Sequence, residues 1–226
     1  MPTTVPLKLE GRPARERILL AAHALFYCEG IRATGVDRVI ATAEVAKLTF
    51  YRHFPGKNDL VLAYLERQHE NWIAWFTAAL VRHRPRRGNP LAALVPTIAE
   101  WLADPRFRGC AFLNTVVELG TTLPAATALC RRNKQAMTAA IADLLPPSRQ
   151  RPRQARAIAT AIDGVVMHAQ FEPDAKAPLQ ALRDLLRPLL VEAADGGRKT
   201  VPTPSTGVIA TEATPVPRTR KLRAKK

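Results

Sequence analysis

The chain contains 226 residues, with 34 Lys and Arg against 19 Asp and Glu, and its formal net charge is +15. Because 47% of the residues are hydrophobic, the chain can bury a substantial core, which excludes wholesale disorder. The positive charge favours a polyanionic partner and is unevenly spread: net +3 over 1–55, +5 over 56–195 and +7 over 196–226.

The N-terminal part of the chain predicts three helices. Residues 1–11 are expected to form a flexible arm, and the apolar spacing that follows predicts a helix that ends at Gly30. Thr34 is a candidate N-cap for a second, two-turn helix, and a break around Glu44 precedes a third short helix over 46–53. Two short, closely joined helices after a longer one indicate a helix-turn-helix domain over 12–56.

The remainder of the chain is predicted to be helical almost throughout. One helical face continues from Lys57 over about six turns, and a basic loop rich in Pro and Gly follows it. Further helices are expected at 91–103, 110–119, 124–145, 152–171 and 177–194. The sequence therefore predicts an all-α protein of about nine helices, with a larger helical domain over 57–195. A basic tail rich in Pro, Thr, Lys and Arg, residues 196–226, is expected to be disordered.

Several classes of site and location are not expected. Cys28, Cys110 and Cys130 are widely spaced and odd in number, so neither a disulfide framework nor a metal site is predicted. No cofactor motif is present. A cysteine nucleophile needs a base and an orienting group, and no recognisable set of such residues surrounds Cys28 or Cys110, so an enzyme is not expected. The N-terminus lacks the apolar core of a signal peptide, and no stretch reaches the ~18 apolar residues of a membrane helix. We therefore expect a cytoplasmic protein that makes no contact with a membrane.

One long segment carries a family resemblance: RERILLAAHALFYCEGIRATGVDRVIATAEVAKLTFYRHFPGKNDLVLAYL. Its most specific part is the pattern Tyr51-x-His53-Phe54-x-x-Lys57-x-x-Leu60, and Phe26, Gly30 and Thr34 also match. The segment resembles the DNA-binding domain of TetR-family (tetracycline-repressor-like) transcriptional regulators. The resemblance implies a homodimer that binds a double-stranded DNA operator and responds to a small-molecule effector.

The short third helix is expected to be the recognition helix. Val45, Leu48 and Phe50 are predicted to hold it against the core, which leaves its polar side chains free to contact DNA. Two positions depart from the family pattern: Glu44 stands where Gly is common, and Ala46, which cannot cap a helix, stands where Ser is frequent. The resemblance implies DNA contacts by Lys47, Thr49, Tyr51, His53 and Lys57. Thr34, at the start of a helix, and Arg52, on the outer side of the recognition helix, are further candidates. A solvated charge is the alternative for Arg52, and a place in the core is the alternative for Tyr51.

The larger domain is expected to bind the effector. Its string RGCAFLNTVVELG resembles a segment of a subset of TetR-like regulators. A pocket needs apolar walls and a few convergent polar groups, although each such residue is equally compatible with plain core packing. The candidates are Trp72, Trp75, Phe76, Trp101, Phe107, Phe112, Asn114, Glu118, Met137 and His168. Asn114 and Glu118 share one helix face, so they are expected to contact either a ligand or each other.

The last two helices are expected to pair with their counterparts in a two-fold dimer, as the family resemblance implies. The candidate interface residues are Ala155, Ala159, Ile162, Val166, Leu182, Leu185, Leu186 and Leu189. The function predicted is a repressor that releases a palindromic operator when a small molecule binds. An architectural DNA-binding protein without a sensor is an alternative, and a regulator that senses oxidants through cysteine is another.

Overall fold

The computed structural model describes residues 9–195, with side chains described as far as Leu190. Most of the predicted arm and the whole predicted tail lie outside the described residues. The described chain forms α1 (Ala14–Glu29), α2 (Val36–Thr42), α3 (Lys47–His53), α4 (Lys57–Arg82), a 3-10 helix η1 (Pro90–Ala93), α5 (Leu94–Leu102), α6 (Ala111–Leu119), α7 (Pro124–Ala142), α8 (Arg151–His168) and α9 (Lys176–Asp195). No strand occurs among residues 9–195, and the predicted all-α class is confirmed.

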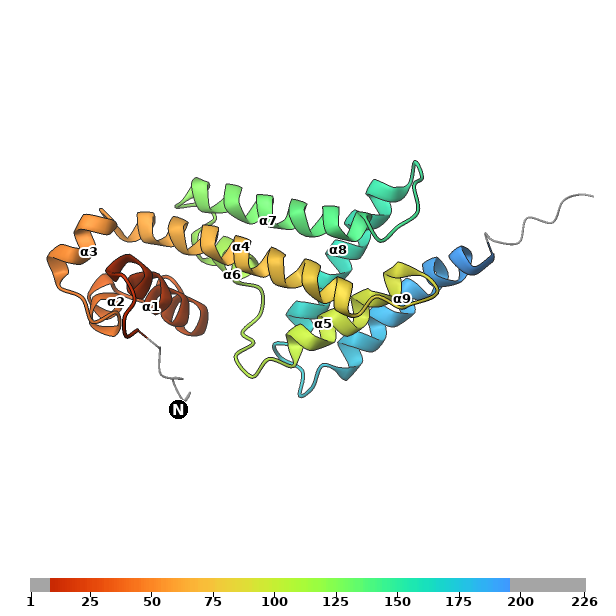
Figure 1. The fold of residues 1–226 in the computed structure, drawn as a ribbon, viewed down its shortest axis with the longest axis horizontal. Helices are drawn as coiled ribbons and strands as arrows, with labels where there is room; N and C mark the ends of the chain where they lie inside the picture. Colours follow the sequence, from red (N-terminus) through yellow and green to blue (C-terminus); the bar gives the residue numbers. More distant parts are fainter. Residues whose placement is uncertain (1–8, 196–226) are drawn as a thin grey trace, which may run out of the picture.

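The helices form an elongated molecule with a small helical head at one end (Figure 1). Helices α1, α2 and α3 make up this head, and α5, α8 and α9 lie toward the other end of the molecule. Helix α4 has 26 residues, about 39 Å at 1.5 Å per residue, and runs from the head into the body beside α7. Helix α4 is therefore long enough to belong to both the head and the body.

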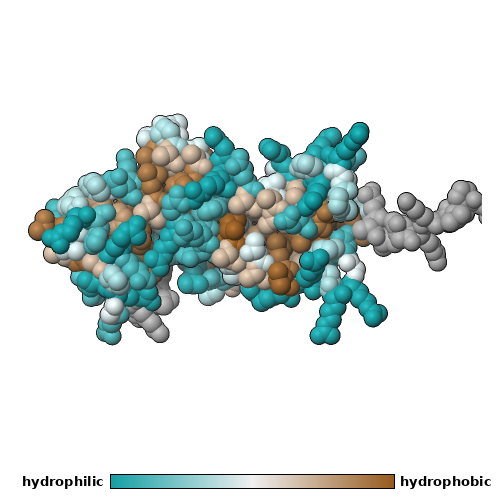
Figure 2. Space-filling view, turned by 45° about the horizontal axis from the view of Figure 1, so that its top comes forward, coloured by the Kyte–Doolittle hydropathy of each residue, from teal (hydrophilic) through white to brown (hydrophobic). Residues whose placement is uncertain are grey.

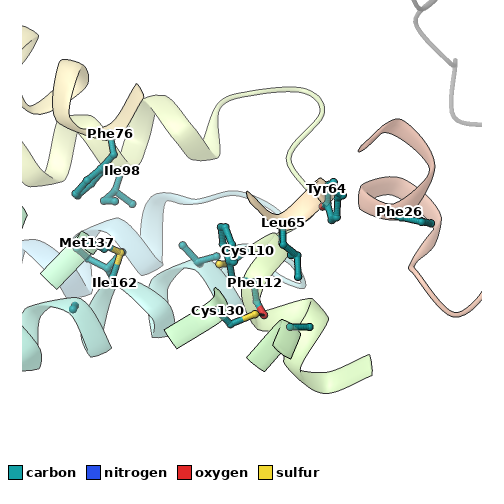
Figure 3. Close-up of a cluster of buried hydrophobic side chains, with 14 of the residues drawn as sticks. Phe26, Tyr64, Leu65, Phe76, Ile98, Cys110, Phe112, Cys130, Met137 and Ile162 are labelled. Atoms are coloured by element: carbon teal, nitrogen blue, oxygen red, sulfur yellow. Dashed lines mark hydrogen bonds between the residues drawn. The ribbon is translucent and has the colours of Figure 1, made fainter. Parts of the chain in front are cut away.

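A continuous apolar core joins the head to the body. Phe26 of α1 packs against Tyr64 of α4 with their ring centroids 5.5 Å apart. Further along α4, Phe76 is fully buried and lies near Ile98 of α5, while Met137 and Ile162 join α7 to α8 (Figure 3). Because one core runs through both parts, the head is packed on the body and is not merely tethered to it.

Most helices begin or end near the Gly and Pro residues that are expected to mark their ends. Gly30 adopts φ +92°, which suits glycine, and its N–H donates to the Phe26 carbonyl at the end of α1. Pro124 and Pro152 occupy the first turns of α7 and α8, where the missing N–H costs nothing. The single helix predicted over 91–103 is wrong in its first turn, because η1 precedes α5 there.

Candidate DNA-binding surface and ligand cavity

Helix α3 is held in the head by its aromatic residues. Phe50 is completely buried, and its ring centroid lies 6.0 Å from that of buried Phe54, over which Arg15 places its guanidinium. Val45 is half-buried against the core, as predicted. Leu48 is predicted to face the core, but this is wrong, because it is 73% exposed. Two residues turn a helix by about 200°, so Leu48 and Phe50 lie on opposite sides of α3.

The polar side chains of α3 lie on its solvent side. Lys47, Tyr51, Arg52 and His53 are exposed, and Thr49 is half-buried. The Lys47 ammonium lies 3.3 Å from Asp37 of α2, but both groups are well exposed, and such a pair contributes little to stability. The helix therefore presents cations, hydroxyls and one imidazole together, and the predicted DNA contacts of these five residues stay predictions.

The other two predicted DNA contacts occupy different surroundings. Thr34 is predicted to cap α2, and this is wrong: the N-cap is Gly35, and the Thr34 hydroxyl donates to the Gly30 carbonyl at 2.8 Å. Thr34 is completely buried, which gives no support to a DNA contact in this conformation. Lys57 begins α4, half-buried, with its ammonium 3.5 Å from the Arg32 carbonyl. Burial lowers the Lys57 pKa, and the nearby Glu118 carboxylate opposes that shift.

The turn between α2 and α3 contains a strained residue. Glu44 has φ +54°, and it is the only residue other than glycine with positive φ among residues 9–195. An L-residue in this left-handed region crowds its Cβ against the backbone, at a cost of about 1–2 kcal/mol. This position is where the family pattern commonly has glycine, so the observed geometry gives that preference a physical reason.

Substituting Glu44→Gly should raise the free energy of unfolding by about 0.5–1 kcal/mol, because glycine adopts positive φ without strain but costs more chain entropy. Glu44→Ala is the matched control, since it removes the charge and keeps Cβ, and it should leave stability nearly unchanged. Urea unfolding followed by circular dichroism measures both variants. Equal stabilisation by Gly and Ala would assign the effect to the charge instead of the backbone.

Hydrogen bonds of two side chains, Tyr27 and Glu118, join the head to the body. The Tyr27 hydroxyl of α1 donates to the Gly109 carbonyl at 2.9 Å and accepts the Arg108 N–H at 3.0 Å. Burial raises the pKa of Tyr27 to about 12, so the hydroxyl keeps its proton at neutral pH. The Glu118 carboxylate, near the end of α6, accepts the Arg32 N–H at 2.7 Å. Sequence reasoning missed Tyr27, because nothing in a single sequence reveals a partner 82 residues away.

Removing the Tyr27 hydroxyl with Tyr27→Phe should cost about 1–2 kcal/mol of stability, since the Arg108 amide and Gly109 carbonyl both lose their partner. Hydrogen exchange should also become faster at the Arg108 amide. Tyr51→Phe is a matched control, because Tyr51 is 43% exposed, and it should change stability by less than about 0.5 kcal/mol. A Tyr27→Phe variant as stable as wild type would refute this fastening.

Most of the predicted pocket aromatics pack on one another. Trp72 lies between Phe76 and Trp101, with ring centroids 4.8 Å and 5.3 Å away, and Trp75 lies 6.4 Å from both tryptophans. Phe107 closes the cluster against Trp101 at 5.9 Å. The Trp75 indole N–H donates to Glu100, whereas the buried Trp72 indole N–H has no partner in the described part of the chain. These residues form a core cluster between α4 and α5.

The polar residues predicted to line a ligand pocket do not converge on one pocket. Asn114 donates its amide to the Arg108 carbonyl at 3.0 Å, and Glu118 contacts the head, so the two neither meet each other nor line a common pocket. His168 is exposed and lies 3.2 Å from the Glu172 carboxylate, so its predicted pocket role stays a prediction. Met137 is a buried core residue between α7 and α8.

A cavity of about 210 Å³ does lie between α6 and α7. Of the predicted pocket residues only Phe112 lines it, and the cavity is apolar with two cations from α7. The lining residues are Phe112, Leu113, Val116, Thr127, Cys130, Arg131 and Lys134. Burial raises the pKa of the Cys130 thiol to about 11, and this thiol donates to the Phe112 carbonyl at 3.3 Å. No group of three or more metal-binding side chains occurs among the described residues.

Most of the predicted dimer contacts face the interior of the protomer. The residues concerned are between 0% and 6% exposed: Ala155, Ala159, Ile162, Val166, Leu182 and Leu186. The protomer's own core covers the apolar face on which these six residues lie, so their predicted dimer contacts stay predictions without support from exposed surface. Leu185, 62% exposed, and half-buried Leu189 on α9 remain candidates.

The exposed face of α8 carries small residues followed by large apolar ones. Ala157, Thr160 and Gly164 are exposed on it, and a Cβ at Gly164 would meet no atom within 4 Å. Met167, 44% exposed, continues the same face, and Phe171, 67% exposed, lies in the turn just after α8. This stripe is missed by a search for hydrophobic periodicity, because its small residues carry little hydrophobicity.

The fold and the head define the class of this protein: an all-helical protein whose N-terminal helix-turn-helix is packed on a larger helical body. The sequence profile described as "Bacterial regulatory proteins, tetR family" matches residues 18–64. The structure superposes on that of a TetR-family transcriptional regulator from Streptomyces coelicolor with a TM-score of 0.71 and 29% identity, covering 80% of this chain and 90% of the other. Residues 18–64 thus match the TetR family, and the described chain shares the fold of a TetR-family transcriptional regulator.

Two curated relatives match part of the chain. The transcriptional activator FasR from Mycolicibacterium smegmatis is 36% identical over 66 residues, 29% of this chain and 30% of that protein. The transcriptional regulator TcmR from Streptomyces glaucescens is 30% identical over 83 residues, 37% of this chain and 34% of that protein. The matches thus span about a third of the length of these relatives.

Proposed function

We propose that the protein is a homodimeric transcriptional regulator that binds a palindromic DNA operator and releases it when a small molecule binds the body. The observation that carries the proposal is the solvent side of α3, which presents Lys47, Tyr51, Arg52 and His53 together on a helix fixed by buried Phe50. A helix held in this way can enter the major groove with its polar side chains toward base edges and phosphates.

The exposed stripe of α8, from Ala157 to Met167, supports a two-fold dimer together with Phe171 in the turn that follows it. Small residues allow two helices to approach closely, and exposed Met167, Phe171 and Leu185 supply apolar area that a partner copy would cover. A dimer places two copies of α3 on one duplex, and half-sites about 34 Å apart then lie on the same side of the DNA. This symmetry is the reason for proposing a palindrome.

The cavity between α6 and α7 is the proposed effector site. Its apolar walls and its two cations, Arg131 and Lys134, suit a small apolar molecule with an acidic group. Helix α6 lines this cavity with Phe112 and Val116, and its Glu118 contacts the Arg32 amide of the head. A ligand that fits better when α6 is displaced would therefore favour a different position of the head, and DNA binding would weaken.

The proposal is tested by selecting binding sites from a random DNA library with the purified full-length protein. We expect a palindromic consensus, and an affinity that falls steeply with salt because phosphate contacts release counterions. Lys47→Ala should weaken binding and lower the magnitude of the log–log salt slope by about 1, because one phosphate is no longer neutralised. Lys176→Ala, an exposed lysine on α9, is the control and should leave the slope unchanged. Binding without any sequence preference would contradict the proposal.

The two alternatives make different predictions. An architectural DNA-binding protein should bind all sequences alike, with an affinity that depends on the basic tail, which lies outside the described residues. A cysteine-based sensor should lose DNA binding on oxidation. Cys110 and Cys130 are both buried and Cys28 is exposed, and Lys134 interacts closely with the Cys110 thiol. If Cys110→Ser left an oxidant response intact, this thiol would not be the sensor.

A further inference from the structure

Leu48 is an apolar side chain in the middle of a polar surface. It is 73% exposed on α3, with Lys47 beside it and Arg52 one turn further along the same side of the helix. Exposed leucines are common in proteins, so exposure alone carries no argument. What sets Leu48 apart is its place on the helix that carries the proposed DNA contacts, at the second helical residue.

Its position in the helix favours contact with base edges. In helix-turn-helix proteins the first residues of the recognition helix approach the bases, whereas residues further along contact the backbone. Lys47 precedes Leu48, and Tyr51, 43% exposed, lies three residues after it. Figure 2 shows hydrophobic surface at the end of the molecule occupied by α3, bordered by hydrophilic surface. If α3 lies in the major groove of DNA, Leu48 enters the groove with the hydrogen-bonding and cationic side chains of α3 beside it.

We propose that Leu48 is a specificity-determining residue that reads the 5-methyl group of thymine in the major groove. Leucine has no hydrogen-bonding group, and the thymine methyl is the one apolar feature that base edges offer there. A protein partner is the less favoured occupant, because one leucine among cations buries far less than the roughly 800 Å² per side of a stable interface. The inference rests on the proposed function, since it requires a duplex against α3.

The test replaces thymine by deoxyuridine, which removes the methyl group and preserves base pairing. The full-length protein is first used to select its operator, and each thymine in one half-site is then changed in turn. At one position wild type should lose about fourfold in affinity, the factor that corresponds to about 0.8 kcal/mol for one buried carbon group. Leu48→Ala should bind the thymine operator about tenfold more weakly, since it removes several buried carbons, and show no further loss with deoxyuridine at that position.

Two control variants separate this contact from general weakening. Lys47→Ala should bind more weakly overall and keep the fourfold sensitivity to deoxyuridine, and Leu48→Met should keep most of it. Because Leu48 is exposed, Leu48→Ala should also retain the wild-type circular dichroism spectrum and melting temperature.

Each other outcome overturns the inference. If no thymine is sensitive in wild type, Leu48 reads no methyl group. If Leu48→Ala keeps the full sensitivity, a different side chain, such as Tyr51 or Thr49, makes the contact. If Leu48→Ala changes the sedimentation of the free protein and not its DNA preference, the leucine belongs to a protein interface. Failure of the proposed function looks different, because no consensus then emerges from the selection.

Discussion

Substituting Gly164→Arg should convert the proposed dimer into a monomer and weaken binding to a palindromic operator by at least about 100-fold. Gly164 lies in the exposed stripe of α8, and a Cβ there meets no atom of its own protomer within 4 Å. The larger side chain is therefore tolerated by the monomer but occupies the space in which a second helix would pack. Loss of the second half-site removes the gain from binding two linked sites at once.

The protomer itself should remain folded, so a loss of the dimer can be told apart from unfolding. The helix propensity of arginine is more favourable than that of glycine by about 1 kcal/mol in a helix interior, so helical content should not fall. Ala139→Arg is the matched control, since Ala139 is exposed on α7 and outside the stripe. Sedimentation equilibrium gives the oligomeric state, and binding to a whole and a half operator gives the affinity. A Gly164→Arg variant that stays dimeric would place the interface elsewhere.

The sequence predicts the elements of this fold well because helix boundaries depend on local chemistry. Gly30, Pro124 and the apolar spacing of α4 act within a few residues, and the observed helices agree with them. The left-handed Glu44 is also a local effect, and the family pattern of glycine points to it. By contrast, which apolar face meets the protomer's core and which stays open depends on distant helices, and that is why the sequence did not reveal that six of the predicted dimer residues are buried inside the protomer.

The candidate sites show the same division between local and distant effects. The exposed residues of α3 follow from helical periodicity around buried Phe50, apart from Leu48, which hydrophobicity alone assigns to the core. The cavity could not be predicted, because its walls come from α6 and α7 and its existence depends on how those helices are spaced. Glu118 stands in a segment that carries a family resemblance, but its partner is the backbone of the head, which no spacing rule reveals.

Lys134 joins the proposed effector cavity to the proposed dimer helix. It lines the cavity from α7, and its ammonium donates to the Asp163 carboxylate of α8, next to Gly164. The two side chains are only 24% and 27% exposed. Burial lowers the Lys134 pKa, but interactions with Cys110 and Asp163 outweigh it, and the net pKa is raised. The structure thus keeps a paired cation at the cavity wall.

Substituting Lys134→Met should lower the free energy of unfolding by about 2–3 kcal/mol, because Asp163 is left as a partly buried charge without its cation. Adding Asp163→Asn should recover part of that loss, since the double variant leaves no unpaired charge. Lys176→Met is the matched control: its pair with Asp174 is 90% and 52% exposed, and its loss should cost less than about 0.5 kcal/mol. Urea unfolding of wild type, both single variants and the double variant gives the coupling between the two residues.

The pH dependence provides a second check on the same pair. A lysine whose folded pKa is raised stabilises the protein fully below its unfolded pKa, near 10.5, and loses that contribution as pH rises through the folded value. The stability difference between wild type and Lys134→Met should therefore stay constant from about pH 7 to 9 and shrink above about pH 10.5. If the double variant is no more stable than Lys134→Met, the lysine stabilises by packing, and the charge link from cavity to dimer helix is absent.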